Sequence, residues 1–285
     1  MTRKILFMII FISLLCTYPV IGQDRRKPGP WDQDLYIFES SDGLRFRKLD
    51  LFVKGGGVAS IINDSKGRLI AAFQWFPSES KEAFDRVAVK ISTDNGMTWS
   101  NPKSIKINEL PFRLIRPCDP TLVLLEKGLI RLYFTSDPRD GHGPGTYSAI
   151  SSDGVNYRFE HGERFRIPGR MILDCAVTRL GEKWHYYAPV QNNPGVSYHA
   201  ISDDGLEFKR LNDVTIPGNK QWLGCVLPIK NGIRFYGGSW SAISKDGSNW
   251  KLEHGRRLEG ADPGVVHTSE GKYIAIATGP PRKRH

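Results

Sequence analysis

The 285-residue sequence has little cysteine and no long helical pattern. One of its four cysteines, Cys16, lies in an apolar N-terminal run, and no pair among Cys118, Cys175 and Cys225 has the C-x-x-C spacing of a zinc site. Three distant cysteines do not make a disulfide framework, although a Cys175–Cys225 disulfide stays open for an exported protein. Without a 3.6-residue apolar period a helical fold is excluded, and we expect no metal and no cofactor.

Only one apolar run has the composition of a membrane or export signal. A basic pair precedes the run at 5–16, and small residues suited to cleavage follow at 20–22. The run is too short for a membrane span and is typical of a secretory signal peptide. We therefore predict a signal peptide at 1–22, a single domain at 23–285, and a secreted or periplasmic location, with no other segment able to cross a bilayer.

Acidic residues are fewer than basic ones, 30 against 40, which gives a formal net charge of +10. Removal of Arg3 and Lys4 with the signal peptide changes +10 to +8. The remaining basic residues are scattered along strand-like segments, whereas a nucleic-acid binder concentrates them on one helix or face. The charge therefore indicates solubility and some attraction to anionic glycans, with no nucleic-acid partner.

Five segments repeat the pattern Ser-x-Asp-(x)-Gly-x-x-aromatic. They begin at Ser40, Ser92, Ser151, Ser202 and Ser244, with spacings of 52, 59, 51 and 42 residues. In each segment the Asp can accept hydrogen bonds from turn amides, the Gly can adopt a positive φ, and the aromatic ring can pack beneath the turn. Five copies at this spacing predict one such turn in each of five similar units.

The segments between these turns also repeat. Each is a short apolar strand, a polar Gly-containing turn and an alternating, aromatic-rich strand, at 58–76, 120–136, 176–190, 226–240 and 264–279. Together with the strands around each Asp turn, every unit supplies four strands, so we predict an all-β, five-bladed β-propeller. Because the first Asp turn precedes the first strand pair, the N-terminal hairpin should complete the last blade and close the ring.

The five turns resemble the Asp boxes of the sialidase superfamily over nearly the whole chain after the signal peptide. The number of blades and the Asp-Pro elements on inner strands are similar to those of arabinanase-like glycosidases. Phe-Arg-Ile-Pro at 165–168 also resembles a sialidase motif, whose Arg binds the sugar carboxylate. However, Ile-Pro-Gly recurs at 216–218 with Thr215 in place of Arg166. We interpret this motif as a blade-to-blade link and not as a carboxylate clamp.

When the starts of the five inner strands are aligned, three Asp and two Gly residues share one position. These residues are Gly57, Asp119, Asp174, Gly224 and Asp262. Asp is poorly suited to a sheet interior, and crowded carboxylates must be protonated, paired or used. Arg116 and Arg170, shortly before the first two Asp residues, could pair with them or bind the substrate. The Asp turns should lie on the opposite face.

The three acids favour glycoside hydrolysis, which needs a carboxylate and a carboxylic acid on either side of the scissile bond. The resemblance to arabinanase-like enzymes implies an inner-strand Asp as base, a second Asp that orients and tunes, and a Glu as acid. Asp119 or Asp262 matches the base and Asp174 the second Asp. No inner strand carries a matching Glu, so Glu163 and Glu259 in the links are the substitutes. The alternative is that the Asp residues only accept hydrogen bonds from backbone amides in a non-catalytic glycan- or protein-binding propeller.

Several further residues could contact a sugar. Trp75, Trp222 and Trp240 could stack on sugar rings or pack between blades. His142, in a Gly-rich loop, could be an acid, a ligand or an exposed side chain. The expected partner is a glycan or oligosaccharide, and the oligomeric state is left open.

Overall fold

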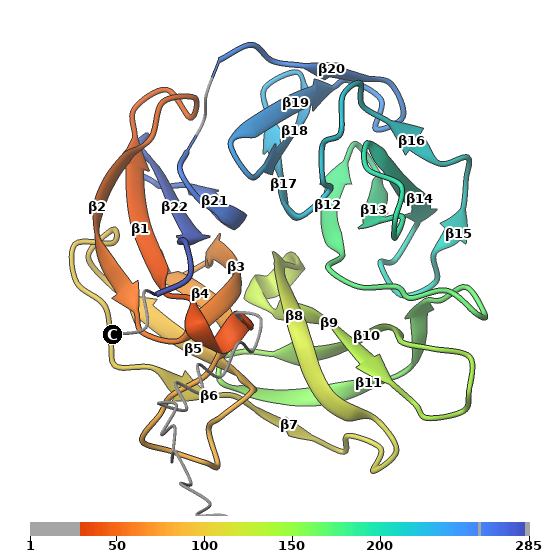
Figure 1. The fold of residues 1–285 in the computed structure, drawn as a ribbon, viewed down its shortest axis with the longest axis horizontal. Coiled ribbons are helices and arrows are strands. Elements are labelled where there is room, and N and C mark those ends of the chain that lie inside the picture. The colour runs from red at the N-terminus through yellow and green to blue at the C-terminus, as the bar shows by residue number, and fades with distance from the viewer. Residues whose placement is uncertain (1–28, 256–257, 283–285) are drawn as a thin grey trace, which may run out of the picture.

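The computed structural model describes residues 29–255 and 258–282, and its sheets surround a central axis as five blades (Figure 1). The predicted all-β, five-bladed propeller is confirmed. Within the described residues the helices are two single 3₁₀ turns, η1 (Pro30–Asp32) and η2 (Glu126–Gly128), and no helix there has the length and apolar character to span a membrane. The predicted signal peptide at 1–22 lies outside the described residues.

In every blade the first-named strand lies nearest the axis and the others follow outwards. Blade 1 contains β21 (Ala261–His267), β22 (Tyr273–Thr278), β1 (Leu35–Ser40) and β2 (Arg47–Val53). Blade 2 contains β3 (Gly56–Asn63), β4 (Leu69–Trp75), β5 (Arg86–Ser92) and β6 (Lys103–Ser104). Blade 3 contains β8 (Ile115–Leu124), β9 (Ile130–Asp137), β10 (Gly145–Ser151) and β11 (Asn156–Phe165), with β7 (Lys106–Asn108) added outside β11 in parallel. Blade 4 contains β12 (Ala176–Leu180), β13 (Lys183–Pro189), β14 (Val196–Ser202) and the interrupted outer strand β15 (Lys209–Arg210) and β16 (Val214–Thr215). Blade 5 contains β17 (Gly224–Ile229), β18 (Gly232–Gly237), β19 (Trp240–Ser244) and β20 (Trp250–Leu252).

The ring closes as predicted, through the N-terminal hairpin. Strand β1 pairs antiparallel with β22 from Leu35–Thr278 to Ser40–Tyr273, so the two ends of the chain share blade 1. Near the same place, the backbone N–H of Arg282 donates to the carbonyl of Asp32 at 2.8 Å. Because β1 and β22 pair with each other, neither strand is left with an unpaired edge.

Each Asp turn joins the third and fourth strands of a blade and has the hydrogen bonds expected of it. In all five, the Ser hydroxyl donates to the Asp carboxylate at 2.7–3.1 Å and accepts from the Gly N–H at 2.8–3.0 Å. The backbone N–H groups of Arg45 and Leu44 donate to Asp42 and lower the pKa of that carboxyl to about 2. The turns are thus held by local contacts that the sequence pattern encodes.

The Asp turns also connect neighbouring blades. A tyrosine hydroxyl on the second strand of one blade donates to the Gly carbonyl in the turn of the next blade, at 2.7–2.9 Å. The pairs are Tyr133–Gly205, Tyr187–Gly247 and Tyr236–Gly43. At the other two interfaces the turn glycine lies against an isoleucine, Gly96 against Ile274 and Gly154 against Ile70. Each turn therefore closes a blade and fixes its position against the blade before it.

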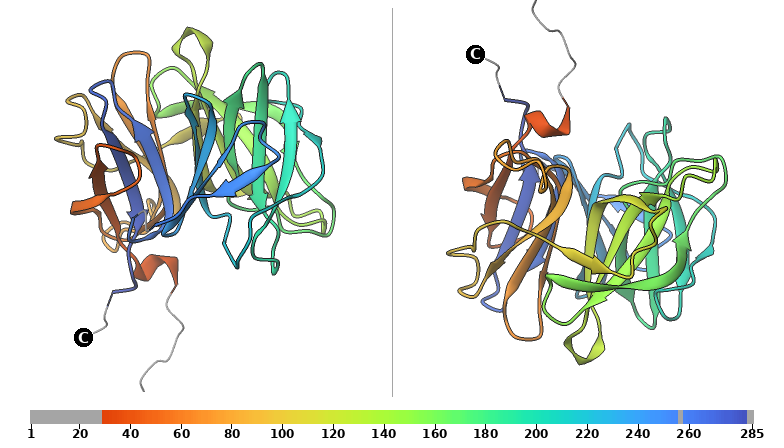
Figure 2. Two further views of the ribbon diagram at one scale, coloured as in Figure 1. Left: turned by 90° about the horizontal axis from the view of Figure 1, so that it is seen from above. Right: turned by 90° about the horizontal axis from the view of Figure 1, so that it is seen from below.

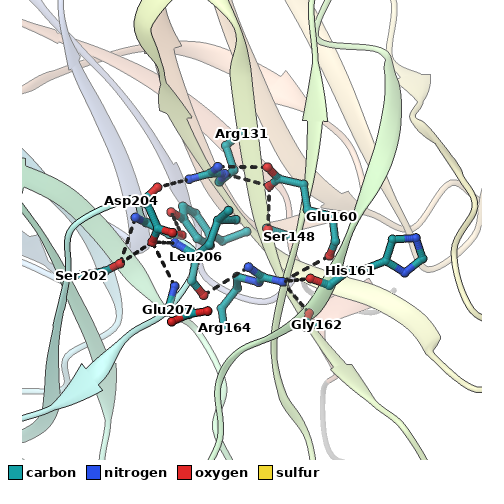
Figure 3. A network of polar contacts seen from close by, with 12 residues as sticks. Arg131, Ser148, Glu160, His161, Gly162, Arg164, Ser202, Asp204, Leu206 and Glu207 are labelled. Atoms are coloured by element: carbon teal, nitrogen blue, oxygen red, sulfur yellow. Dashed lines mark hydrogen bonds and ion pairs between the residues drawn. The ribbon is translucent and has the colours of Figure 1, made fainter.

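A buried ion pair lies beside one of these contacts (Figure 3). Arg131 of β9 binds both carboxylate oxygens of Glu160 on β11 at 2.7 and 2.9 Å and donates to the carbonyl of Asp204 in blade 4. Ser148 of β10 donates to the same carboxylate at 2.8 Å. Arg–Ser–Glu contacts therefore tie three strands of blade 3 to the next Asp turn.

Blade 5 repeats this arrangement and blade 4 replaces it. Arg234 binds Glu253 at 2.9 and 3.1 Å, and Ser241 donates to Glu253, as in blade 3. In blade 4 the corresponding second and third strands carry His185 and His199, whose ring nitrogens lie 3.0 Å apart in a stacked pair. Internal repetition thus extends to the polar core, with one blade using imidazoles in place of an ion pair.

Because the strands of each blade are antiparallel, the propeller has two different faces. We call the face with the Asp turns the turn face, and the face on which the links enter the inner strands the link face. Figure 2 shows η1 and η2 on opposite sides of the wheel, η1 on the link face and η2 on the turn face. The inner strands β3, β8, β12, β17 and β21 run from the link face to the turn face.

Candidate active site

The inner strands share a backbone distortion at their link-face ends, close to the central axis, in a region that we call the hub. At or just before the start of each strand, one equivalent residue has a positive φ: Val58 (46°), Asp119 (51°), Asp174 (50°), Gly224 (142°) and Asp262 (47°). The strand register shifts around Val58, Asp119 and Asp262, as in a β-bulge. The fifth equivalent position is therefore Val58, and the expected Gly57 is wrong by one residue, because the bulge adds a residue that alignment of strand starts does not show.

Positive φ is strained for residues other than Gly, although Asp tolerates it better than most. Four of the five hub positions carry a side chain in this conformation. Strain of this kind persists only where the surrounding structure imposes it, and it gathers at functional sites. Here it holds three carboxyl groups, from blades 3, 4 and 1, at one level of the hub.

Asp119 and Asp174 form a hydrogen-bonded pair. Both the backbone N–H and the carboxyl group of Asp174 donate to the carboxylate of Asp119. The thiol of Cys118 lies 3.5 Å from Asp119 Oδ2. Two adjacent carboxyl groups cannot both ionise without a large repulsion, so a proton held by Asp174 and shared toward Asp119 is the stable arrangement.

The environment separates the pKa values of the acids. Burial and the charges of Asp119 and Asp262 raise the pKa of Asp174 well above its usual range. Burial, followed by the charge of Asp119, raises the pKa of Asp262 to about 6. Burial also raises the pKa of Asp119, but its contacts with Thr135, Cys118 and Asp174 oppose this effect. Asp174 therefore holds its proton to higher pH than an ordinary aspartate, whereas Asp262 loses its proton near pH 6.

A small cavity adjoins these acids. It measures about 10 Å³ and is lined in part by Val58, Asp174, Gly224 and Asp262. That volume is roughly the size needed to hold one water molecule. Oδ1 of Asp262 is buried and has no hydrogen-bond partner among the described residues, so it is available to a water or a substrate hydroxyl.

The expected pairing of arginines with these acids is not found. Arg116 donates to Asp85 Oδ2 at 2.6 Å and not to Asp119, and its side chain is 65% exposed. Gln74 donates to the other oxygen of Asp85 at 2.8 Å. Arg170 is exposed, and among the described residues no ion pair joins it to Asp174. Asp119 accepts hydrogen bonds from Cys118 and Asp174 in place of a cation, and burial, which the sequence does not reveal, raises the pKa of both acids.

Asp85 is a site residue that the sequence interpretation missed. It ends the loop between β4 and β5, has a φ of 60°, and its charge acts on Cys118, next to Asp119. Nothing in the sequence of this loop distinguishes Asp85 from the other acidic residues there.

The structure places Glu163 outside the hub. It lies near the end of β11, accepts a 3.2 Å hydrogen bond from Tyr147, and pairs with Arg166, which also binds Asp140. Glu259 is exposed in the link between β20 and β21. The charges that raise the pKa of Asp174 and Asp262 come from the three aspartates themselves, with Asp119 acting on both and Asp262 acting on Asp174. Arg166 lies in the blade 3 to blade 4 link, and its guanidinium is occupied by Glu163 and Asp140.

Two of the three candidate stacking tryptophans belong to the core. Trp222 is 1% exposed and lies against Tyr187, Phe235 and Trp240, itself buried. These residues pack between blades 4 and 5 and do not face a ligand. Trp75 is partly buried at the link-face end of β4 and packs against the core of blades 1 and 2.

His142 is the remaining candidate for a contact with the sugar. His142 is exposed, and its backbone N–H donates to Asp140 at 3.0 Å. Across residues 29–255 and 258–282, no cluster of three or more His, Cys, Asp or Glu side chains is arranged to hold a metal ion.

The cysteines of the described residues, Cys118, Cys175 and Cys225, are free thiols, so the disulfide left open between Cys175 and Cys225 does not form. Burial raises the pKa of both these thiols to about 12. The sulfur of Cys225 accepts the backbone N–H of Val265 at 3.2 Å, and the carbonyl of Cys175 accepts the hydroxyl of Thr121. Cys175 and Cys225 therefore contribute to contacts between inner strands as small side chains, Cys175 buried and Cys225 partly buried.

Comparison with known proteins shows relationships at the level of structure. No family model and no curated protein matches the sequence. Among solved structures, a Dyadobacter fermentans protein of unknown function has 13% identity over 88% of this chain and 85% of its own, with a TM-score of 0.60. A thermostable family-43 glycoside hydrolase has 13% identity, coverage of 82% and 96%, and a TM-score of 0.57. The Penicillium chrysogenum α-L-arabinanase has 14% identity, coverage of 85% and 84%, and a TM-score of 0.56. The chain thus has the five-bladed propeller fold that these glycosidases have.

Proposed function

We propose that this protein is an exported glycoside hydrolase that cleaves a glycan at the three hub carboxyl groups on the link face. The observation that carries the proposal is the contrast between Asp174 and Asp262. The first has its pKa raised well above the usual range, and the second, with a pKa of about 6, has an unpartnered oxygen. Groups whose environments push their pKa values apart are suited to serve as acid and base in one reaction.

In the proposed reaction Asp262 is the base and Asp174 the acid. The ionised Asp262 takes a proton from a water molecule while the water oxygen bonds to the anomeric carbon. The glycosidic C–O bond breaks, and the leaving oxygen takes the proton of Asp174. Asp119 accepts the hydrogen bond of Asp174 and orients its carboxyl group. Solvent then returns a proton from Asp262 to Asp174, which restores the starting state.

The fold and its relatives give this proposal its substrate class. The similar solved structures include an arabinanase and a family-43 hydrolase, so a glycan is the substrate that we infer. The five Asp turns and the N-terminal apolar run support membership of an exported Asp-box group. Exposed Arg116 and partly buried Trp75, at the entry of β8 and the end of β4, are candidates for contacts with the sugar.

Hydrolysis of a panel of aryl glycosides by wild-type protein and by Asp174→Asn and Asp262→Asn tests the proposal. Each variant should lose at least about 100-fold in kcat/KM, since a positioned general acid or base contributes roughly that much or more. Asp203→Asn is the matched control, because Asp203 lies on the turn face and its side chain is 85% exposed. Unchanged activity in Asp174→Asn, or no hydrolysis by the wild-type protein, would reject the assignment.

A second candidate is a non-catalytic glycan- or protein-binding propeller. Two observations favour it: the cavity beside the acids holds only about 10 Å³, and Asp119 accepts the backbone N–H of Asp174 as a structural carboxylate would. Glycan-array binding that persists in Asp174→Asn, together with no turnover of any aryl glycoside, would support this function in place of hydrolysis.

A further inference from the structure

The axis contains a second, larger cavity that the proposed reaction does not use. It occupies about 560 Å³ and extends along the inner strands toward the turn face. Ser60, Thr121 and Cys225 line both this cavity and the small one beside the acids. The two cavities therefore meet at these three residues, which we call the hub constriction. The large cavity, which we call the axial channel, opens on the face opposite the proposed active site.

The wall of the axial channel is mainly aliphatic. Every inner strand contributes at least one branched apolar residue, such as Ile61, Val123, Val177, Val226 and Val265. Leu124, at the end of β8, also lines the channel and remains 39% exposed. Water in such a space finds few hydrogen-bond partners, whereas an apolar molecule would release that water and cover the exposed side chains.

One polar atom in the channel lacks a partner. The side-chain oxygen of Asn63, the last residue of β3, is buried and accepts no hydrogen bond within the described part of the chain. An unsatisfied buried acceptor is unfavourable unless a water or a ligand supplies a donor. At the channel wall, Arg179 pairs with Glu126 at 3.4 Å, so the charges there balance and single out no ionic ligand.

We propose that the axial channel binds a small neutral aliphatic molecule that carries one hydrogen-bond donor, such as an alcohol, for Asn63. The channel volume lies in the range of typical small-molecule sites, which combine an apolar wall with a few polar groups that fix orientation. This site is independent of the hydrolase proposal, because it lies on the turn-face side of the constriction.

Fluorescence of N-phenyl-1-naphthylamine, a neutral apolar probe, tests the site without any enzymatic substrate. The wild-type protein should bind one equivalent saturably, and 1-octanol should displace it. Leu124→Glu places a charge on the channel wall and should weaken probe binding at least tenfold. Leu51→Glu is the matched control, since Leu51 is 38% exposed on outer strand β2 and does not line the channel. Absence of saturable binding, or equal binding by both variants, would overturn the proposal.

The donor requirement is tested in the wild-type protein by comparing 1-octanol with octyl methyl ether. Octanol should displace the probe at a concentration about fivefold lower, the effect of one net hydrogen bond. This preference should disappear in Asn63→Leu. Equal displacement by the alcohol and the ether in wild-type protein would reject the role of Asn63, and this result does not depend on how well any variant folds.

Discussion

The hydroxyl of Tyr133 in blade 3 donates a 2.7 Å hydrogen bond to the carbonyl of Gly205, in the Asp turn of blade 4. Gly205 has a φ of 73°, and a Cβ atom there would lie 2.7 Å from this hydroxyl oxygen and from Arg131 Nη1. Glycine is therefore required both by backbone conformation and by the close approach of the neighbouring blade. The same relationship at Gly43 and Gly247 makes the Asp turns part of the blade interfaces.

Gly205→Ala should lower the free energy of unfolding by about 3 kcal/mol or more, since overpacking adds to the cost of a positive φ. Gly218→Ala is the control, because Gly218 has the same φ of 73° but no heavy atom within 4 Å of the added Cβ. The control should lose only about 1 kcal/mol. Urea denaturation of both variants measures the difference, and equal losses would contradict a packed turn.

Glu160→Gln should destabilise the protein by about 3 kcal/mol, because it leaves the buried guanidinium of Arg131 without its counter-ion. The side chains of this pair are only 6% and 13% exposed, and Figure 3 shows how the pair connects to Ser148 and Asp204. In contrast, Asp203→Asn removes a surface pair with Lys183 and should change stability by less than about 0.5 kcal/mol. Similar effects of the two substitutions in denaturation experiments would refute the distinction.

The stacked histidines of blade 4 should make stability fall in acid. Burial lowers the pKa of His199 to about 4 and also lowers the pKa of His185. An unfolded histidine titrates near pH 6.5, so below this pH the unfolded state binds more protons and is favoured. Comparing pH 8 with pH 5, we expect His199→Phe to remove about 2 kcal/mol of the loss that wild-type protein shows. A pH dependence unchanged by this substitution would show that the pair does not titrate as proposed.

Asp262 should have the opposite effect on stability. Its pKa is raised to about 6, so the folded state binds the extra proton, and this contribution is lost as pH rises through 6. Asp262→Asn should therefore stabilise the protein at pH 7 by up to about 3 kcal/mol and change little at pH 4. Thermal denaturation at the two pH values measures this effect, which does not depend on the substrate. An Asp262→Asn protein less stable than wild type at pH 7 would contradict the strained, unpaired carboxylate described here.

The amino-acid sequence by itself was sufficient to predict the five-bladed propeller fold. Turn residues act through local hydrogen bonds, as in the contacts of the Ser40 hydroxyl with Asp42 and with the N–H of Gly43, and alternation of apolar residues acts through burial. Both leave a repeating pattern that can be recognised without long-range information, so the number of blades and the pairing of β1 with β22 could be predicted.

The tertiary structure alone decided the chemistry of the hub. Whether Arg116 meets Asp119 or Asp85 depends on how blades 2 and 3 pack, and whether Asp174 holds a proton depends on burial and on charges from blades 3 and 1. Likewise, the bulge that makes Val58 the fifth hub position shifts one residue without changing the apolar pattern. These properties arise from contacts between residues distant in the chain, and such contacts leave no local pattern in the amino-acid sequence.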